Sequence, residues 1–318
     1  MTCRPSLYLD LLVVVVAACS SSSAPSSVPP RPLYVANRGG NSITAYDSSA
    51  MGNATPTIAI VGSNTRLNQP SGVAVDAGGR LYVSTHTDSI VVYAAGATGN
   101  ATPTATITGS NTGLSQPQAI AFDAVGRLYV ANVVINTITV YAAGATGNAT
   151  PTATITGSNT GLSQPAGIAL DAADRIYVSN PASSPSITVY AVGATGNATP
   201  TAIIAGGNTG LIGPGAMAFD AAGRLYVANG NSLSLTYNIT VYGAGATGNV
   251  APTATIAGSN TGLNGPSSLA FYRKIVGAQH AAPLPNGGLR HRGARERSRA
   301  LVCARPPRRS GELVSRRS

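Results

Sequence analysis

The sequence contains no tryptophan and only three phenylalanines among its 318 residues. Its three cysteines are Cys3, Cys19 and Cys303, so none lies between residues 20 and 302. This excludes an internal disulfide and a cysteine-bound metal cluster from that segment. Charged residues make up 9% of the chain, against about 25% in a typical soluble domain. Glycine, alanine, serine, threonine and asparagine take their place, a composition that favours strands and tight turns over helices.

Glutamate is absent between residues 33 and 271, where the acids are seven aspartates and the only histidine is His86. Convergent carboxylates, which acid–base or metal chemistry would need, are therefore scarce. The segment offers no assignable Ser–His–Asp set, no phosphate loop and no HExxH motif. We expect no catalytic residue, metal or cofactor, and His86 is more typical of a solvated loop than of a general base.

The net charge of +10 comes entirely from the C-terminal end of the chain. Residues 272–318 hold twelve basic and two acidic residues, whereas residues 1–271 hold eight arginines and eight aspartates. A neutral body gives no reason to expect nucleic-acid binding by residues 33–271.

The N-terminal end has the features of an export signal. Residues 1–18 combine Arg4 with the apolar run Leu11–Ala18, which is shorter than the roughly 20 residues that span a bilayer. The run ends in Val-Ala-Ala before Cys19, which resembles the lipobox of bacterial lipoproteins. The resemblance implies lipidation of Cys19, a Ser/Pro-rich tether over 19–32, and anchoring in the cell envelope, at the outer membrane or cell surface. An ordinary signal peptide is the alternative.

A repeat of about 48 residues fills the body of the chain. The pentapeptide Leu33–Asn37 recurs four times at offsets of 48, 47, 48 and 49 residues. Each unit divides into four short strand-like segments separated by turns, which is typical of a β-propeller blade. The turn between the first two segments opens with an aspartate that can bond its backbone. These aspartates are Asp76, Asp123, Asp171 and Asp220.

These units predict an all-β propeller of four-stranded blades over residues 33–271, with five blades in this chain. The body begins at a second strand and ends at a first strand, Ser268–Phe271, which is expected to complete the first blade and close the ring. After Phe271 the repeat stops in mid-motif, and residues 272–318 are an Arg-rich segment of low complexity. A shifted reading frame would explain the break and would imply six or more blades; the alternative is a genuine, disordered basic tail that contacts anionic lipid or nucleic acid.

The motif of the units resembles that of NHL-repeat propellers. It reads Pro-x-Gly-[Val/Ile]-Ala-x-Asp, then Gly-Arg-[Leu/Ile]-Tyr-Val, then Asn-x-Ile-x-Val-Tyr, and is best seen in Pro70–Tyr93 and Pro117–Tyr141. The period is longer than is usual for that family, mainly through the segment Gly-Ala-Thr-Gly-Asn-Ala-Thr-Pro. The resemblance implies the propeller fold; its wider group includes protein- and RNA-binding modules, sensor domains and lactonase-like hydrolases.

The copies differ most in the loop that follows the second strand, and recognition on propellers is commonly carried by loops gathered on one face. Residues at this strand exit are our candidates for a binding face, with simple strand capping as the alternative. They are Asn37, Thr85, His86, Asn132, Asn180 and Asn229.

The sequence favours a monomeric, non-enzymatic binding or scaffold protein of the cell envelope, whose ligand is a protein, peptide or glycan. It would contact the membrane through its lipid anchor only. The alternative is a metal-dependent hydrolase of the lactonase or gluconolactonase type, a class that holds a central metal with acids and asparagines. A truncated gene product without a stable function is the third hypothesis.

Overall fold

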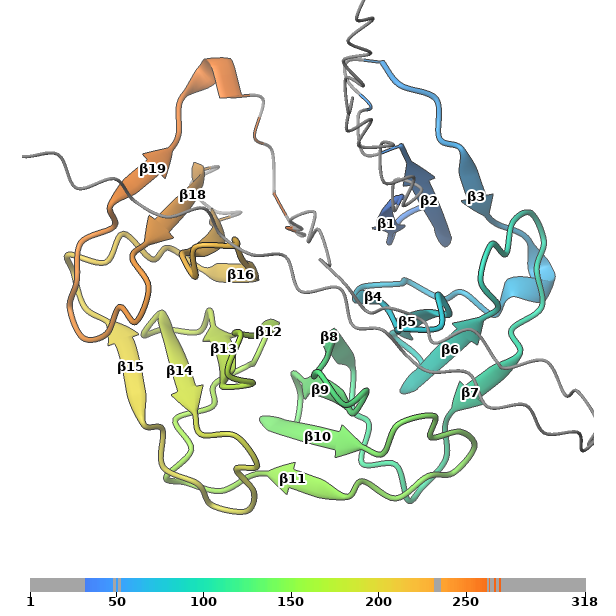
Figure 1. Cartoon of the computed structure of the whole chain (residues 1–318), viewed down its shortest axis with the longest axis horizontal. Coiled ribbons are helices and arrows are strands. Elements are labelled where there is room, and N and C mark those ends of the chain that lie inside the picture. Colours follow the sequence, from blue (N-terminus) through green and yellow to red (C-terminus); the bar gives the residue numbers. More distant parts are fainter. Residues whose placement is uncertain are drawn as a thin grey trace, which may run out of the picture. The chain divides into compact units, whose positions relative to one another are not determined.

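The structure, a computed structural model, supports the propeller prediction (Figure 1). It describes residues 32–269 except 48–49, 51–52, 232–235, 262, 264–265, 267–268. The predicted signal peptide, almost all of the tether, the closing strand and the basic tail therefore lie outside the described residues. No helix in the described part of the chain is long and apolar enough to cross a membrane.

Five antiparallel sheets follow one another along the chain, and we call them blades 1 to 5. Blade 1 contains β1 (Leu33–Asn37), β2 (Ser42–Tyr46) and β3 (Ile58–Ile60). Blade 2 contains β4 (Val73–Val75), β5 (Leu81–Thr85), β6 (Ser89–Tyr93) and β7 (Ala105–Ile107). Blade 3 contains β8 (Pro117–Phe122), β9 (Leu128–Asn132), β10 (Thr137–Tyr141) and β11 (Ala153–Ile155). Blade 4 contains β12 (Gly167–Leu170), β13 (Ile176–Asn180), β14 (Ser186–Tyr190) and β15 (Ala202–Ala205). Blade 5 contains β16 (Pro214–Phe219), β17 (Leu225–Asn231), β18 (Thr236–Tyr242) and β19 (Ala254–Ile256).

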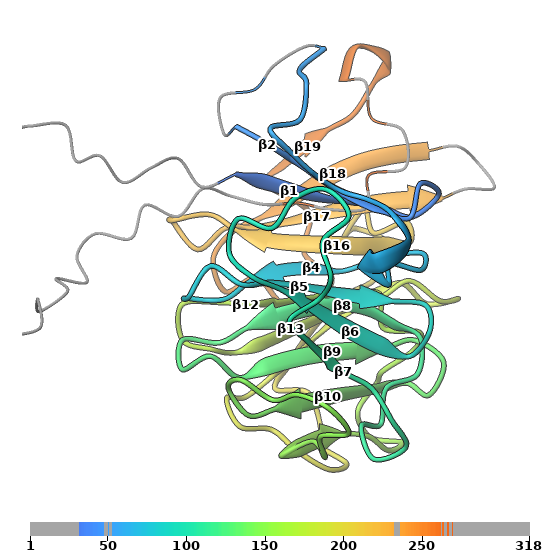
Figure 2. The same ribbon diagram turned by 90° about the vertical axis from the view of Figure 1, so that its right-hand side faces the viewer.

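Strands that are neighbours in sequence are neighbours in each sheet, so every blade is a simple meander. The first strands β4, β8, β12 and β16 lie nearest the centre in Figure 1, and each of the first three contacts the first strand of the next blade. A meander places the loop between its second and third strands at the same end as the linker to the next blade. We call this end the linker face. Figure 2 shows the loops gathered at the two ends of the strands.

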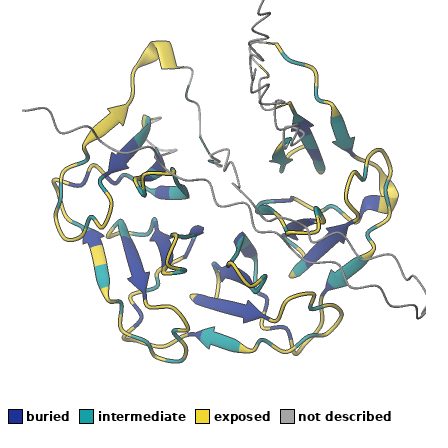
Figure 3. Cartoon of the chain, in the orientation of Figure 1, coloured by how far each residue is buried: buried dark blue, intermediate teal, exposed yellow. Residues whose placement is uncertain are grey.

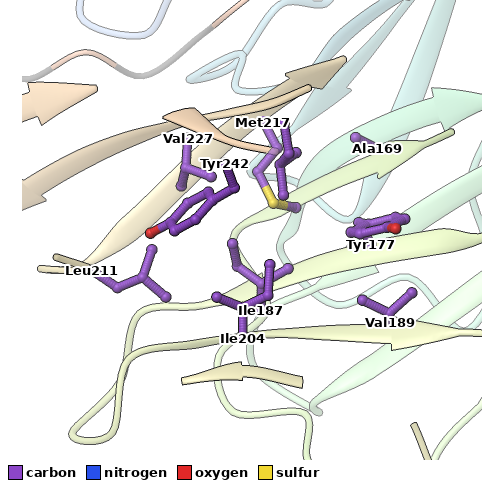
Figure 4. Packing of buried hydrophobic residues seen from close by; sticks show 10 residues of the cluster. Ala169, Tyr177, Ile187, Val189, Ile204, Leu211, Met217, Val227 and Tyr242 are labelled. Atoms are coloured by element: carbon purple, nitrogen blue, oxygen red, sulfur yellow. The ribbon is translucent and has the colours of Figure 1, made fainter. Parts of the chain in front are cut away.

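The hydrophobic core is divided into layers between consecutive blades. The second and third strands are buried on both sides, as in β9 and β10, because each sheet is covered by a blade on either face. Between blades 4 and 5, Ile187 and Ile204 pack against Tyr242 and Met217 (Figure 4). Polar contacts between the blades and their linkers supplement these apolar layers.

One polar contact between blades is made by the tyrosine that ends each third strand. Its hydroxyl donates to a threonine carbonyl in the linker that precedes its own blade, at 2.5–2.6 Å. We call this contact the tyrosine tie. The pairs are Tyr93–Thr65, Tyr141–Thr112, Tyr190–Thr160 and Tyr242–Thr209.

A second contact explains the length of the repeat. The loop between the third and fourth strands runs back along the outer strand of the preceding blade and makes one parallel bridge to it, such as Ile107 with Gly147. The next residue, Asn148, then accepts a hydrogen bond through Oδ1 from the amide of Asn111 at 2.8 Å. We call this the asparagine tie. It recurs at Asn100, Asn197 and Asn249.

The asparagine tie requires glycine on the preceding blade. Gly109 has φ +126°, and a Cβ placed on it would lie 2.5 Å from Oδ1 of Asn148. Gly62, Gly157 and Gly206 stand at the equivalent positions, with similar φ values. The segment that lengthens the repeat is therefore a clamp between blades.

We expect Gly109→Ala to destabilise the fold more than Gly258→Ala. Gly258 has a similar φ of +113°, but no described residue would lie within 4 Å of a Cβ placed on it. Both variants bear backbone strain of about 1–3 kcal/mol. Only Gly109→Ala adds the clash with Asn148, worth roughly another 1–3 kcal/mol. Urea unfolding of dilute protein compares the two, and equal losses would contradict the clamp.

The buried tyrosines should make the fold sensitive to alkali. Burial raises the pKa of Tyr141 and of Tyr190 to about 12, from an unperturbed 10.0, although hydrogen bonds lower it in part. Because the folded pKa lies above the unfolded one, their contribution to stability is complete below pH 10 and is lost as the pH rises towards 12. Thermal melts across this range should show falling stability.

Tyr141→Phe is the matched variant for this prediction. It should be less stable at neutral pH by about 1 kcal/mol, because the hydroxyl no longer bonds the Thr112 carbonyl. It should also lose less stability between pH 10 and 12 than the unsubstituted protein. Parallel alkaline curves for the two proteins would show that Tyr141 does not titrate as proposed.

Candidate functional site

Most of the predicted strand-exit residues are interior residues. Asn132, Asn180, Asn229 and Thr85 are 0% exposed. Asn132 donates through Nδ2 to Thr139 Oγ1 at 3.1 Å and accepts at Oδ1 from the amide of Ser115 at 3.1 Å. Asn180 and Asn229 make equivalent bonds. These side chains bind the incoming linker to the second strand, which is the strand-capping role, and the structure does not present them to a ligand.

Asn37, the first member of the series, lies half-buried in blade 1. Its Nδ2 donates to Thr44 Oγ1 at 3.0 Å. Thr85 replaces asparagine in blade 2 and bonds the hydroxyl of Ser89 at 2.7 Å instead. The remaining predicted position is His86, which is half-buried on the linker face.

The four turn aspartates are fully engaged in their own turns. Asp123 accepts from the amides of Val125 and Arg127 and from Arg127 Nε, the last at 2.6 Å. Asp76, Asp171 and Asp220 pair in the same way with an arginine four residues later. Each arginine also lies over the ring of a tyrosine two residues on, 5.6–5.8 Å from its centre.

These interactions occupy the turn carboxylates with hydrogen bonds and ion pairs. At Asp220, desolvation raises the pKa, but the hydrogen bonds from the amide and guanidinium of Arg224 outweigh it and lower the pKa. A carboxylate that already accepts several hydrogen bonds is a poor ligand for a metal or substrate. The sequence pattern predicted the turn role of these aspartates but not their arginine partners.

The remaining aspartates are also partnered. Asp88 accepts from the amide of Gln116 at 2.6 Å, in the position that Asn41 and Asn136 occupy in blades 1 and 3. Asp174 has φ +57°, and its carboxylate accepts from the amide of Ala124 at 3.3 Å. Asp47 has an interaction of its own. Within the described residues, no group of three His, Cys, Asp or Glu could hold a metal ion.

One cluster of chemically versatile side chains stands on the linker face between blades 1 and 2. Arg38 follows β1, His86 follows β5, and Gln69 lies in the linker between the blades. Arg38 Nη2 approaches His86 Nε2 and Gln69 Oε1 at 3.3 Å each, and Arg38 Nε approaches Gln69 Oε1 at 3.4 Å. We call these three residues the Arg38 cluster.

The backbone holds the cluster in place from both sides. The amide of His86 donates to the carbonyl of Asn68 at 3.0 Å, and the amide of Gln69 donates to Asn41 Oδ1 at 2.8 Å. Gln69 therefore keeps a positive φ of +45° at the residue before Pro70. The loops that carry Arg38 and His86 are fixed to the same linker, so their side chains meet there.

The hydrogen bonding assigns the state of His86. Because the guanidinium can only donate, Nε2 of His86 accepts, and the neutral ring carries its hydrogen on Nδ1. Nδ1 is buried and has no hydrogen-bond partner among the described residues. The exposed Arg38 fork offers further donors to an anionic group, and the imidazole can take up a proton. Arg38 can therefore bind an oxyanion, and His86 can exchange a proton beside it.

The other blades do not have the arginine and histidine of this cluster at the corresponding positions. The residues that correspond to Arg38 and His86 in the other blades are Val133, Pro181 and Gly230. His86 and the variable loop were predicted from the sequence, whereas Arg38 and Gln69 were not. The signal that could have found Arg38 is its spacing of one repeat, 48 residues, from His86.

The fold and the repeat define the protein as an NHL-like β-propeller. More specifically, the chain belongs to the SMP-30/Gluconolactonase/LRE-like region family, whose profile matches residues 15–192, more than half of its length. The matched segment includes β1 to β14 and therefore contains the Arg38 cluster. No curated protein matches the chain.

Solved structures similar to the chain include a provisionally assigned 6-phosphogluconolactonase from Bacteroides uniformis. It has 17% sequence identity and a TM-score of 0.48, over 73% of this chain and 69% of that chain. The hydrazine synthase of Kuenenia stuttgartiensis has 16% identity and a TM-score of 0.48, over 66% of this chain and 59% of that chain. At these values neither similarity carries an argument about function.

Proposed function

We propose that the protein is a lactonase-like hydrolase that uses the Arg38 cluster rather than a metal as its reactive site. The observation that carries the proposal is the 3.3 Å contact of Arg38 with His86 in a propeller of the gluconolactonase-like family. This replaces the binding or scaffold role that the sequence favoured, for which the comparisons offer no support. The substrate class is a neutral cyclic ester.

The residues of the cluster supply the elements of ester hydrolysis. His86 Nε2, once released from Arg38, accepts a proton from water as the oxygen of that water bonds to the ester carbonyl carbon. Arg38 donates hydrogen bonds to the oxyanion that forms. The ring C–O bond then breaks, and the leaving alkoxide takes the proton from the imidazolium, which yields a hydroxy acid. Gln69 orients the guanidinium, and the cluster could retain the carboxylate product through Arg38.

The metal that gluconolactonase-type propellers hold does not fit the described residues. The carboxylates there are committed to turns and loops, and the strand-exit asparagines are buried with their amides bonded internally. No step of the proposed reaction passes through a metal. Activity that survives chelation is therefore part of the proposal.

Export and membrane anchoring through Cys19 complete the proposal. The lipobox-like segment and the Ser/Pro-rich tether would place the propeller at the bacterial cell surface or outer membrane.

We expect purified protein to open γ- and δ-lactones in the presence of a chelator, measured as acid release. Arg38→Met should lower kcat about 10²–10³-fold through loss of oxyanion stabilisation, and His86→Gln about 10²–10⁴-fold through loss of the base. Arg66→Met is the matched control, since Arg66 is exposed in the linker but outside the cluster. Lactone binding without turnover would restore the binding-protein hypothesis; activity lost on chelation would contradict the metal-free site.

Cys19→Ala should release the protein from the membrane fraction, because a single lipid-bearing residue supplies the anchor. Cys303→Ala removes a cysteine outside the lipobox and should leave fractionation unchanged. Immunoblots of membrane and soluble fractions compare the two. Membrane retention of Cys19→Ala would refute the anchor without affecting the proposed hydrolase site.

A further inference from the structure

The two end blades expose the surfaces that the other blades bury against one another. Ile256 in β19 is 44% exposed, whereas its counterparts Ile60, Ile107, Ile155 and Ile204 are 0% exposed. Figure 3 shows β19 exposed along its length. Leu33 in β1 is 45% exposed, whereas its counterparts Leu81, Leu128, Ile176 and Leu225 are at most 2% exposed. Among the described residues, therefore, no blade covers the face of blade 5 that carries Ile256 or the face of blade 1 that carries Leu33.

Each end also carries half of the residues that form the asparagine tie and the tyrosine tie between consecutive blades. Blade 5 carries Gly258, with φ +113°, and exposed Thr261, the counterparts of Gly109 and Thr112. Blade 1 carries Asn53 and Tyr46, the counterparts of Asn148 and Tyr141. No described residue lies within 4 Å of a Cβ built on Gly258, whereas Asn148 fills the equivalent place in the tie of Gly109. The receiving half of an asparagine tie is therefore formed at blade 5, and no described residue occupies it.

The two ends complement each other because they are two faces of one repeat. In the interface between blades 1 and 2, Ile43 and Ile60 of one blade pack against Leu81, Val83 and Tyr93 of the next. Blade 5 presents Ile239 and Ile256 in the first role, and blade 1 presents Leu33, Val35 and Tyr46 in the second. The neutral repeat body adds no net charge repulsion between two such surfaces.

We propose that blade 5 of one molecule docks onto blade 1 of a second copy of the same chain, repeating the interface that joins consecutive blades. Within one molecule these ends do not cover each other, since Leu33 and Ile256 are both exposed. The contact joins two different surfaces, so it is heterologous, and each added copy leaves a free end of either kind. Association grows head to tail, in contrast to the monomer expected from the sequence.

Single-end variants test the direction of this contact. Ile256→Glu blocks the blade 5 end and Leu33→Glu blocks the blade 1 end, and both replace residues that are already exposed in one molecule. The full chain in mild detergent should show a mass by light scattering that rises with concentration. Each variant alone should have the mass of one chain, because every copy lacks the same end. An equimolar mixture should form a dimer and grow no further.

Two further variants test whether the contact between blade 5 and blade 1 is specific. Ile203→Glu makes the same change at an outward position of similar exposure, 42%, and should associate as the unsubstituted chain does. Gly258→Ala leaves the exposed surface almost unchanged but clashes with the Asn53 of a docked copy, and should weaken association about tenfold or more. Circular dichroism confirms that each variant is folded.

Three results would overturn the proposal. They are a single-chain mass for the unsubstituted protein at every concentration, association by either single-end variant alone, and a mixture of the two variants that stays monomeric. A monomer that is destabilised by Ile256→Glu would instead show that the ends close on each other within one chain.

Discussion

The asparagine tie is the contact on which the rest of the propeller depends. Asn148 reaches back over the outer strand of the preceding blade and bonds the amide of Asn111, at a place where Gly109 alone leaves room. The tie requires the long loop before the fourth strand, which sets the length of the repeat. It also holds the start of each linker, and the end of the first linker carries Gln69, against which Arg38 and His86 meet.

The strands and turns could be predicted from the sequence because they depend on contacts within one unit. The alternation around Leu128 and the aspartate at 123 are local signals, and the structure contains both as expected. The ties could not be predicted, because Asn148 finds its partner 37 residues upstream in another unit. The strand-exit asparagines looked like surface residues for the same reason: the linker that covers Asn132 comes from the preceding blade.

A chain of nearly identical units restricts where a reactive site can arise. A residue that recurs from blade to blade, such as the turn aspartate of blades 2 to 5, makes the same structural contacts in each of them and is not free for another role. Chemistry therefore has to come from positions where one copy departs from the others. Arg38 and His86 are such positions, and their side chains meet because one repeat separates them along the chain and one linker joins them in space. Sequence comparison among the units locates such positions, whereas the distance between them needs the structure.

Each blade boundary uses the same two ties and the same apolar layer, and none depends on which two units it joins. A gain or loss of one whole unit would therefore create no mismatched boundary, because the new neighbours already fit. Such a gene can change its number of units by unequal recombination between its own repeats without any compensating substitution. The near identity of the units is what such recent duplication would leave, and blade number becomes a quantity that selection can adjust in single steps.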